Sequence, residues 1–177
     1  MSGQQRVASM TIRRPLPEDV PGVRAAHAAL AASDEFTFGF ELDELSDEGW
    51  LAQLDREARG IDLPEHLVRA SFLVGLVAGQ VVGRVSVRHE LNEMLAWYGG
   101  HIGYGVIPSA RGRGHATALA QAGLALLAED GTDTALLTCE ATNAASIATI
   151  LRVGGVFRDE IELADGQRAH RYDVVTG

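Results

Sequence analysis

The chain has 177 residues, of which 46% are hydrophobic, and its formal net charge is −9. This length and composition are typical of one globular domain with a sizeable core and exclude a disordered chain. The acidic balance argues against nucleic acid as the main partner, and no apolar run approaches the ~20 residues of a membrane-spanning helix. The chain has no lysine, which excludes a P-loop, because that motif needs a lysine on the phosphates.

Cysteine content and the first residues bear on the cellular compartment. Cys139 is the single cysteine, so the chain has no internal disulfide, and we expect this residue to lie in the core. The first six residues are polar and unlike a secretory signal, and residues 1–8 are expected to be a loose terminus. Together these features predict a cytoplasmic protein.

The N-terminal third is predicted to hold one short strand and two helices. The strand is expected around Ile12, and apolar residues then recur at helical spacing over residues 20–30. A second helix is predicted between Ser46, a good N-cap, and Gly60. Three phenylalanines in residues 36–40 are interpreted as a packed loop, with a substrate-binding wall as the alternative.

Residues 68–77 and 81–88 are predicted to pair as an antiparallel hairpin around a Gly-containing turn. The segment that follows, residues 89–100, is long for a loop between neighbouring strands. Long loops are often functional, so we expect this one to border a binding site.

Residues 101–107 read as a strand, with Ile102, Tyr104 and Val106 on one side. Gly103 and Gly105 interrupt it, which indicates a bulge or the close approach of another backbone or a ligand. A glycine-rich turn then leads into a predicted helix made mostly of good helix formers. The unit is a strand, a glycine-rich turn and a helix N-terminus.

That unit is suited to binding an anion. The first N–H groups of a helix have no partner inside the helix, and the helix dipole adds partial positive charge there. Gly112 and Gly114 remove side chains that would keep a phosphate away, while Arg111 and Arg113 add charge and donors. The turn therefore predicts a phosphate site, the alternative being two solvated arginines on an ordinary turn.

The C-terminal third is predicted to continue with a strand over residues 134–139. Asn143 is a good N-cap for a helix over residues 144–153. A final hairpin is expected from residues 156–163 and 168–174, around a turn at Gly166.

The motif Arg111-x-x-Gly114-x-Ala116, preceded by a strand ending Val106-x-Pro108, resembles the acetyl-CoA signature of the GNAT N-acetyltransferase superfamily. The order of predicted elements over about residues 9–175 resembles that family too. The resemblance implies an α/β (α+β) fold in a single domain over residues 1–177. Its sheet is expected to be mixed and mostly antiparallel, with about seven strands, about four flanking helices and two strands splayed apart at the cofactor site.

The resemblance also implies the residues that bind acetyl-CoA. The pyrophosphate is expected on the glycine-rich turn, and the pantetheine arm beside Gly105 and Val106, with the Val106 N–H polarising the thioester carbonyl. Asn143 and Ser146 match an Asn-x-x-Ser/Ala motif that contacts the arm, although Asn143 also reads as a simple helix cap. The expected cofactor-binding residues are Gly105, Val106, Arg111, Gly112, Arg113, Gly114, His115, Ala116, Thr117, Asn143 and Ser146.

The catalytic residues are less well defined by the resemblance. His101 aligns with a position where some members carry a catalytic glutamate, and it is the first candidate for the general base. Glu90 is the second candidate. The family often has a tyrosine as general acid toward the thiolate, but the matching position here is Ile150, which has no hydroxyl. A metal site at His89 and His101 is not expected, because no third ligand is evident.

The function that these features predict is acetyl transfer from acetyl-CoA to a primary amine of a small molecule or a peptide. The alternative is an acetyl-CoA-binding sensor with little catalysis. A dinucleotide enzyme is a weaker reading, because the glycine motif follows a hairpin instead of opening a βαβ unit. The acceptor is expected between residues 36–40, the helix after them and residues 89–100. Dimers are common in the family, so a homodimer is one expected assembly.

Overall fold

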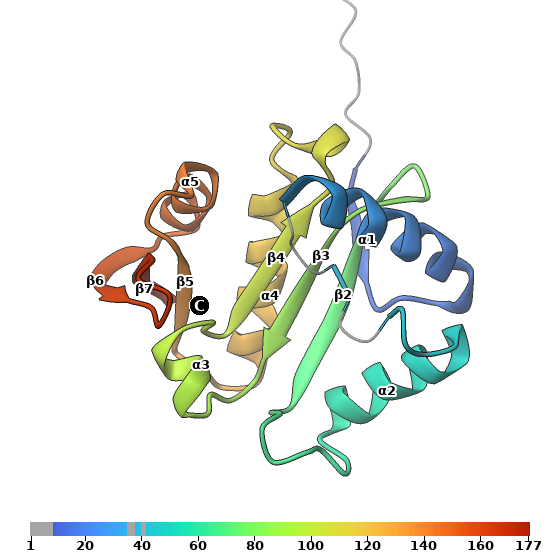
Figure 1. The fold of residues 1–177 in the computed structure, drawn as a ribbon, viewed down its shortest axis with the longest axis horizontal. Helices are drawn as coiled ribbons and strands as arrows, with labels where there is room; N and C mark the ends of the chain where they lie inside the picture. The colour runs from blue at the N-terminus through green and yellow to red at the C-terminus, as the bar shows by residue number, and fades with distance from the viewer. Residues whose placement is uncertain (1–8, 35–37, 40–41) are drawn as a thin grey trace, which may run out of the picture.

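The computed structural model describes residues 9–34, 38–39 and 42–177. Its strands form two antiparallel sheets, one in the order β1-β2-β3-β4 and one in the order β5-β7-β6 (Figure 1). The strands are β1 (Thr11–Arg13), β2 (Ala70–Val77), β3 (Gln80–Arg88), β4 (Ile102–Val106), β5 (Thr134–Glu140), β6 (Val156–Glu162) and β7 (Arg168–Val175). The predicted fold class and the predicted mostly antiparallel pairing are confirmed.

Helices flank the four-stranded sheet on both faces (Figure 1). The described helices are α1 (Val20–Asp34), α2 (Asp47–Arg59), α3 (Glu93–Trp97), α4 (His115–Glu129) and α5 (Ala144–Arg152), with 3-10 turns at Pro17–Asp19 and Pro108–Ala110. Of these, α5 lies beside β5 and not on the four-stranded sheet (Figure 1). Helix α4 packs so closely on one face that a Cβ at Gly123 would lie 3.1–3.3 Å from Ile102, Val85 and Val87. Helices α1 and α2 cover part of the opposite face.

The core under α1 and α2 is aromatic. The rings of Trp50 and Phe72 meet edge to face with centroids 5.5 Å apart, and the ring of Phe38 meets Phe72 in the same way at 6.4 Å. Phe38 is fully buried, as the packed-loop interpretation predicts. Phe36 and Phe40 lie outside the described residues.

Local capping signals define two helices as the sequence predicts. The Ser46 hydroxyl accepts a hydrogen bond from the Gly49 N–H at 3.1 Å, and Gly60 ends α2 in a left-handed conformation with φ 67°. The Asn143 side chain accepts from the Ser146 N–H at 3.0 Å at the start of α5.

Two expectations need correction. Residues 89–100 are not wholly loop, because the Asn92 side chain accepts from the Leu95 N–H at 3.0 Å and caps α3. Strand β4 contains no bulge at its glycines, since its pairing with β3 runs without a shift from Ile102 to Val106. The register shifts that occur lie beside Gly75 in β2 and beside Phe157 in β6.

Among the described helices, none is both long and apolar enough to cross a bilayer. The longest are α1 and α4, with 15 residues each.

The two faces of the four-stranded sheet are covered by different helices. One face carries α4 along its middle, and the other carries α1 and α2 toward β1 and β2 (Figure 1).

Candidate active site

Strands β4 and β5 lie next to each other but diverge (Figure 1). They meet where the His101 N–H donates to the Leu136 carbonyl at 2.8 Å and the Leu136 N–H donates to His101 Nδ1 at 2.8 Å. Away from this point no ladder joins them within the described chain, because β4 ends the first sheet and β5 ends the second. The result is a gap between the strands with its vertex at His101, which corresponds to the splay that the family resemblance implies.

Gly100 makes the vertex possible. Its φ is 61°, in the left-handed region, and an added Cβ would lie 2.3 Å from the Leu136 carbonyl oxygen. No other residue fits such a close approach of two backbones. The sequence contained a signal for this position in its Gly-Gly pair, but the partner strand is 36 residues away and could not be identified from it.

The open edge of β4 presents backbone groups to the gap. The Arg88 N–H bonds to the His101 carbonyl and the Ile107 N–H bonds to the Val82 carbonyl, which fixes the alternation of the β3–β4 ladder. In an antiparallel pair, residues between the hydrogen-bonded pairs turn their N–H groups to the other side. The N–H groups of Tyr104 and Val106 therefore point into the gap.

The gap leads to the glycine-rich turn at the start of α4. Gly112 and Gly114 have φ values of 73° and 83°, and a Cβ at either position would meet no atom within 4 Å. Gly114 is the N-cap of α4 and offers no side-chain cap, so the first N–H groups of the helix keep their donors for a ligand. This turn, called the cradle below, is open, and the helix dipole gives it partial positive charge.

The two arginines of this turn play different parts. Arg113 is exposed, and no contact of its guanidinium is present among the described residues. Arg111 turns back, and its Nε donates to the Val106 carbonyl at 3.1 Å, beside the mouth of the gap. His115, the first residue of α4, is buried, at 8% exposure.

A pair of hydroxyl groups joins β4 to α5. The Tyr104 hydroxyl lies 2.9 Å from Ser146 Oγ and 3.3 Å from the Ser146 carbonyl oxygen. Burial raises the pKa of Tyr104, which keeps the phenol protonated and able to donate. Ile150 is buried in the core and takes no part here. Sequence reasoning missed Tyr104, whose alternation with two glycines was the available signal.

His101 sits at the vertex in a defined tautomer. Its Nδ1 accepts the Leu136 N–H, so the proton of the neutral ring is on Nε2. Burial, with the nearby charge of Arg88, lowers the pKa of His101, which favours this neutral ring. To accept a proton at Nε2, the ring would have to shift its own proton to Nδ1 and release the Leu136 bond. The general-base role of His101 stays a prediction, and the geometry attaches this condition to it.

Glu90 lies in a different cluster, beyond the end of β3. Its carboxylate is exposed and accepts weakly from the Arg69 N–H at 3.5 Å. The neighbouring His89 bonds to the Ser71 hydroxyl at 2.8 Å and pairs with Asp130. No contact in the described chain joins Glu90 to His101. No group of three or more potential metal ligands occurs in the described ranges either.

Cys139 lies on β5 and is buried. Burial raises the pKa of its thiol, so the sulfur stays protonated and is not an activated nucleophile. Cys139 is therefore not suited to carry an acyl group.

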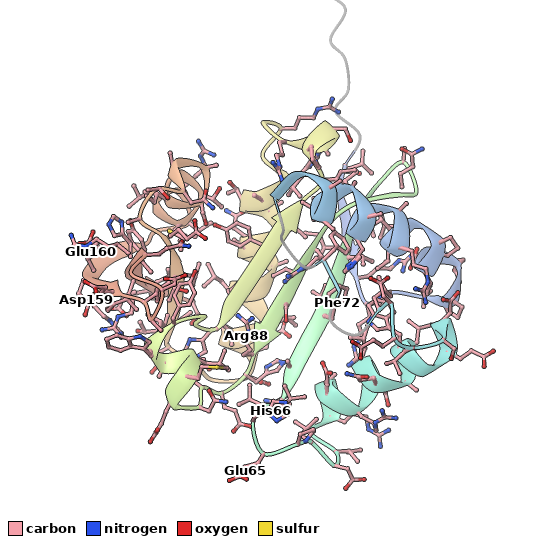
Figure 2. The ribbon with its side chains drawn as sticks, viewed as in Figure 1. Glu65, His66, Phe72, Arg88, Asp159 and Glu160 are labelled. Atoms are coloured by element: carbon pink, nitrogen blue, oxygen red, sulfur yellow. The ribbon has the colours of Figure 1, made fainter. Side chains whose placement is uncertain are left out.

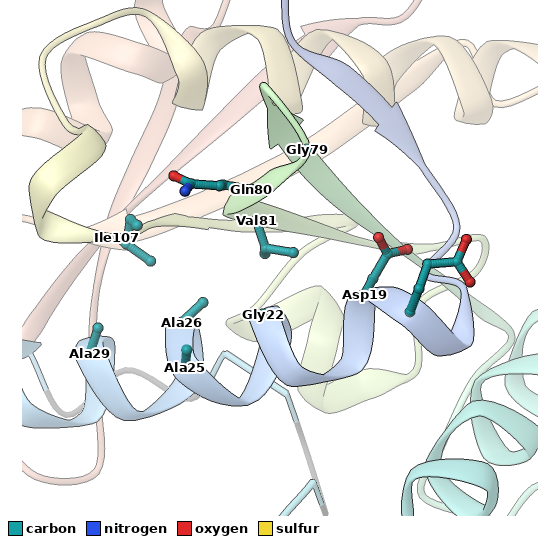
Figure 3. A pocket seen from close by; sticks show the side chains of 10 residues that line it. Asp19, Gly22, Ala25, Ala26, Ala29, Gly79, Gln80, Val81 and Ile107 are labelled. Carbon is teal, nitrogen blue, oxygen red and sulfur yellow. The ribbon is translucent and has the colours of Figure 1, made fainter.

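A cavity of about 370 Å³ lies apart from the gap, between α1 and the β2–β3 turn (Figure 3). Its walls are mostly small side chains, among them Gly22, Ala25 and Ala29. The carboxylate of Asp19 at its edge already accepts from Arg13 at 2.5 and 3.0 Å. Glu18 is the other carboxylate that lines the cavity, and among the described residues no helix N-terminus or glycine-rich turn suited to a phosphate opens into it.

Comparisons with known proteins agree with this geometry. No curated protein sequence matches the chain. Among solved structures, Mycobacterium smegmatis RimJ in complex with a coenzyme A disulfide is similar, with 20% identity, a TM-score of 0.72, and 96% of this chain and 83% of that chain covered. The ribosomal-protein α-N-acetyltransferase RimL, in complex with coenzyme A, has 17% identity and a TM-score of 0.70, with 96% of each chain covered.

The microcin self-immunity acetyltransferase MccE, in complex with acetyl-CoA and AMP, has 16% identity and a TM-score of 0.69, with 94% of this chain and 92% of that chain covered. At these identities the structures establish a shared fold. The family model described as an acetyltransferase (GNAT) domain matches residues 9–156. That span exceeds half of the chain and includes β4, the glycine-rich turn and α5. The chain therefore belongs to the GNAT acetyltransferase family.

Proposed function

We propose that this protein transfers the acetyl group of acetyl-CoA to a primary amine of a small molecule or peptide by direct attack. One observation carries the proposal: the gap between β4 and β5 is edged by the N–H groups of Tyr104 and Val106 and leads to the open N-terminus of α4. An unpaired strand edge next to a helix N-terminus can bind an extended amide-containing arm along the strand and an anion at the helix end. The bound ligands named for RimL and MccE are consistent with this use.

The chain's own groups account for binding. The N–H groups from Gly112 to Thr117, with the exposed Arg113, are placed to hold a pyrophosphate. Asn143 uses its side-chain oxygen as a helix cap and keeps its amide NH₂ exposed for the pantetheine arm. Acetyl-CoA supplies an activated acyl group as a thioester.

The N–H groups that face the gap also have a catalytic use. A donor directed at the acyl oxygen stabilises the negative charge that grows there when an amine attacks. Val106 was the expected donor, and Tyr104 offers a second N–H two residues closer to the vertex. We propose that one of these two N–H groups binds the pantetheine arm and that the other binds the acyl oxygen.

The leaving thiolate needs a proton, and the Tyr104–Ser146 pair is the proposed source. Tyr104 stays protonated because burial raises its pKa, and Ser146 can pass a proton on through the 2.9 Å contact. This arrangement provides the hydroxyl that Ile150 lacks. It also weakens the case for a non-catalytic acetyl-CoA sensor, which was motivated by that missing hydroxyl.

The attacking amine must lose a proton, and His101 and Glu90 remain the two proposed bases. His101 is the nearer to the gap, since it forms the vertex. Glu90 is exposed and ready to accept a proton, but its cluster lies beyond the end of β3. An amine that enters already neutral would need neither residue.

Isothermal titration calorimetry with acetyl-CoA, followed by release of coenzyme A thiol with a panel of amines, tests the function. We expect binding and amine-dependent thiol release. Binding without thiol release from any amine would favour the sensor, and the absence of binding at millimolar acetyl-CoA would contradict both functions. The single, buried Cys139 supports a reducing, cytoplasmic setting for this activity.

A further inference from the structure

Strands β3 and β4 carry polar side chains on the face turned away from α4. The ladder pairs Arg84 with Gly105, Ser86 with Gly103, and Arg88 with His101. Residues directly opposite each other in an antiparallel pair project from the same face. The residues that alternate with them on β3 pack under α4, so the polar set must lie on the other side.

This face is close to the vertex of the gap. His101 forms the vertex, and Arg88 is its direct partner on β3, one strand spacing of about 4.8 Å away. Figure 2 places Arg88 in front of the sheet, between β3 and α3. Because α4 blocks the opposite face, a second substrate would have to approach the vertex from this side.

Two guanidinium groups converge over Gly103. A Cβ at that residue would lie 3.4 Å from Arg88 Nη1, 3.5 Å from Arg84 Nη1 and 3.6 Å from Arg88 Nη2. Glycine at this position lets both side chains lie flat along β4, and a larger residue would displace them. Gly103, where a bulge was predicted, therefore makes room for the two arginine side chains instead.

Backbone carbonyls hold both arginines in place. Arg88 Nη1 donates to the carbonyls of Gly99 at 3.1 Å and Gly100 at 3.3 Å, and Arg84 Nη1 donates to the Gly103 carbonyl at 2.9 Å. Both bonds of Arg88 use Nη1. Its Nε and Nη2 make no hydrogen bond with the described residues and keep their N–H donors. A rigid arginine with two donors remaining on one side of its fork is built to bind an oxyanion.

The charge of Arg88 is not balanced within residues 9–34, 38–39 and 42–177, where no carboxylate forms an ion pair with it. Burial lowers the pKa of Arg88, and burial together with the charge of Arg88 lowers the pKa of Arg84 to about 9. A buried cation without a counter-charge is costly, and an incoming anion offsets that cost.

We propose that Arg88 binds an oxyanion group of the acceptor amine, a carboxylate or a phosphate, and thereby selects the acceptor. Arg84 adds positive charge behind it. This proposal rests on the proposed acetyl transfer. The net charge of −9 repels such an acceptor at long range, so the selection must come from this contact.

The first experiment compares acceptors of equal length: an alkylamine, an aminoalkyl carboxylate and an aminoalkyl phosphate. With the unmodified protein we expect kcat/KM at least ~10-fold higher for one of the anionic amines, about 1.4 kcal/mol of discrimination. Arg88→Gln should abolish that preference through KM and leave the KM for acetyl-CoA unchanged. Arg152→Gln, an exposed arginine on α5, is the matched control and should change neither.

A second readout does not depend on turnover. The protein should be labelled with ¹⁵N-arginine and titrated with two anions in the presence of coenzyme A. One is N-acetylglycine, which is a carboxylate-bearing product analogue, and the other is acetyl phosphate. We expect the Arg88 Nε–H signal, assigned from its loss in Arg88→Gln, to shift with at least one of them. If the signal shifts while no amine is acetylated, acetyl transfer is contradicted and the oxyanion site stands.

Three results would overturn the site. One is a preference for the neutral amine in the unmodified protein, the second is an equal loss on all three amines in Arg88→Gln, and the third is an unchanged Arg88 signal. Arg88→Lys guards against misfolding, because it keeps the charge and one donor to the Gly99 and Gly100 carbonyls. This variant should melt like the unmodified protein and keep part of the preference, as a point charge without the fork would.

Discussion

The hydroxyl of Tyr104 on β4 lies 2.9 Å from the hydroxyl of Ser146 on α5. The two residues are 42 positions apart in the chain, and their contact joins β4 to the helix that follows β5. It brings two exchangeable protons to the place where a thiolate would leave. The family resemblance pointed to position 150 for this hydroxyl, and we propose that Tyr104 on β4 supplies it instead.

Tyr104→Phe removes the proposed acid while keeping the ring. We expect kcat to fall by roughly 10²-fold, at the low end for a positioned acid because Ser146 remains. The KM for acetyl-CoA should change little, and the free energy of unfolding should fall by about 1 kcal/mol for the lost hydrogen bond. Tyr98→Phe, in the loop after α3, is the control. Full turnover in Tyr104→Phe would mean that the Tyr104 hydroxyl does not protonate the thiolate.

Gly114→Val tests the phosphate cradle. Gly114 has φ 83° and an open surrounding, so a valine there is strained and also covers the first N–H groups of α4. Gly166 in the β6–β7 turn has φ 82° and an equally open surrounding, far along the chain from this turn. Gly114→Val and the control Gly166→Val should each lower the free energy of unfolding by about 1–2 kcal/mol through backbone strain.

Of these two variants, only Gly114→Val should lose acetyl-CoA binding in calorimetry. An equal loss in both would mean that strain, and not the cradle, explains the effect. Retained binding in Gly114→Val would remove the pyrophosphate from this turn altogether.

Much of the fold could be predicted because it follows local rules. Ser46, Gly60 and Asn143 define helix ends through bonds that span three or four residues, and period-two patterns define β3 and β4. The glycine-rich turn was recognisable for the same reason, since strand, turn and helix start are contiguous.

The rest depended on contacts between distant segments. The vertex needs Gly100 against Leu136. The proposed oxyanion site needs Arg88 against Gly103, which only the β3–β4 register brings together. The bulge expected in β4 was wrong because glycine in a strand has two explanations, and the pairing partner decides between them. Helix α3 was missed because five residues carry too short a pattern to be distinguished from loop.

Asn143→Ala separates a structural role from a ligand contact. Loss of the bond to the Ser146 N–H should lower the free energy of unfolding by about 0.5–2 kcal/mol. Ser46→Ala removes an equivalent cap from α2, away from the gap, and should cost a similar amount. If acetyl-CoA affinity falls in Asn143→Ala and not in Ser46→Ala, the amide contacts the pantetheine arm. Equal affinity in both variants would leave Asn143 as a cap alone.

His101→Asn separates the base from the structural acceptor at the vertex. The asparagine side-chain oxygen can replace Nδ1 as acceptor for the Leu136 N–H, so the vertex should be kept. If His101 is the base, kcat should fall by roughly 10²–10⁴-fold with little change in acetyl-CoA affinity. The acidic limb of the pH–rate profile should disappear in the variant. In the unmodified protein that limb should lie below pH 6.5, because burial lowers the pKa of His101.

The same shift makes a prediction for stability that does not depend on catalysis. The pKa of His101 in the folded protein is lower than the unfolded value of 6.5, so the unfolded chain binds a proton more readily. The contribution is fully present above pH 6.5 and is lost as the pH falls toward the folded pKa. Chemical denaturation between pH 5 and pH 8 should therefore show a steeper loss of stability for the unmodified protein than for His101→Asn. Parallel curves would mean that the ring is already free to protonate in the folded state, and then neither the Leu136 bond nor burial restrains it as a base.

Activity decides between the two proposed bases. A loss of activity in Glu90→Gln but not in His101→Asn would assign the base to Glu90, whatever the stability curves show.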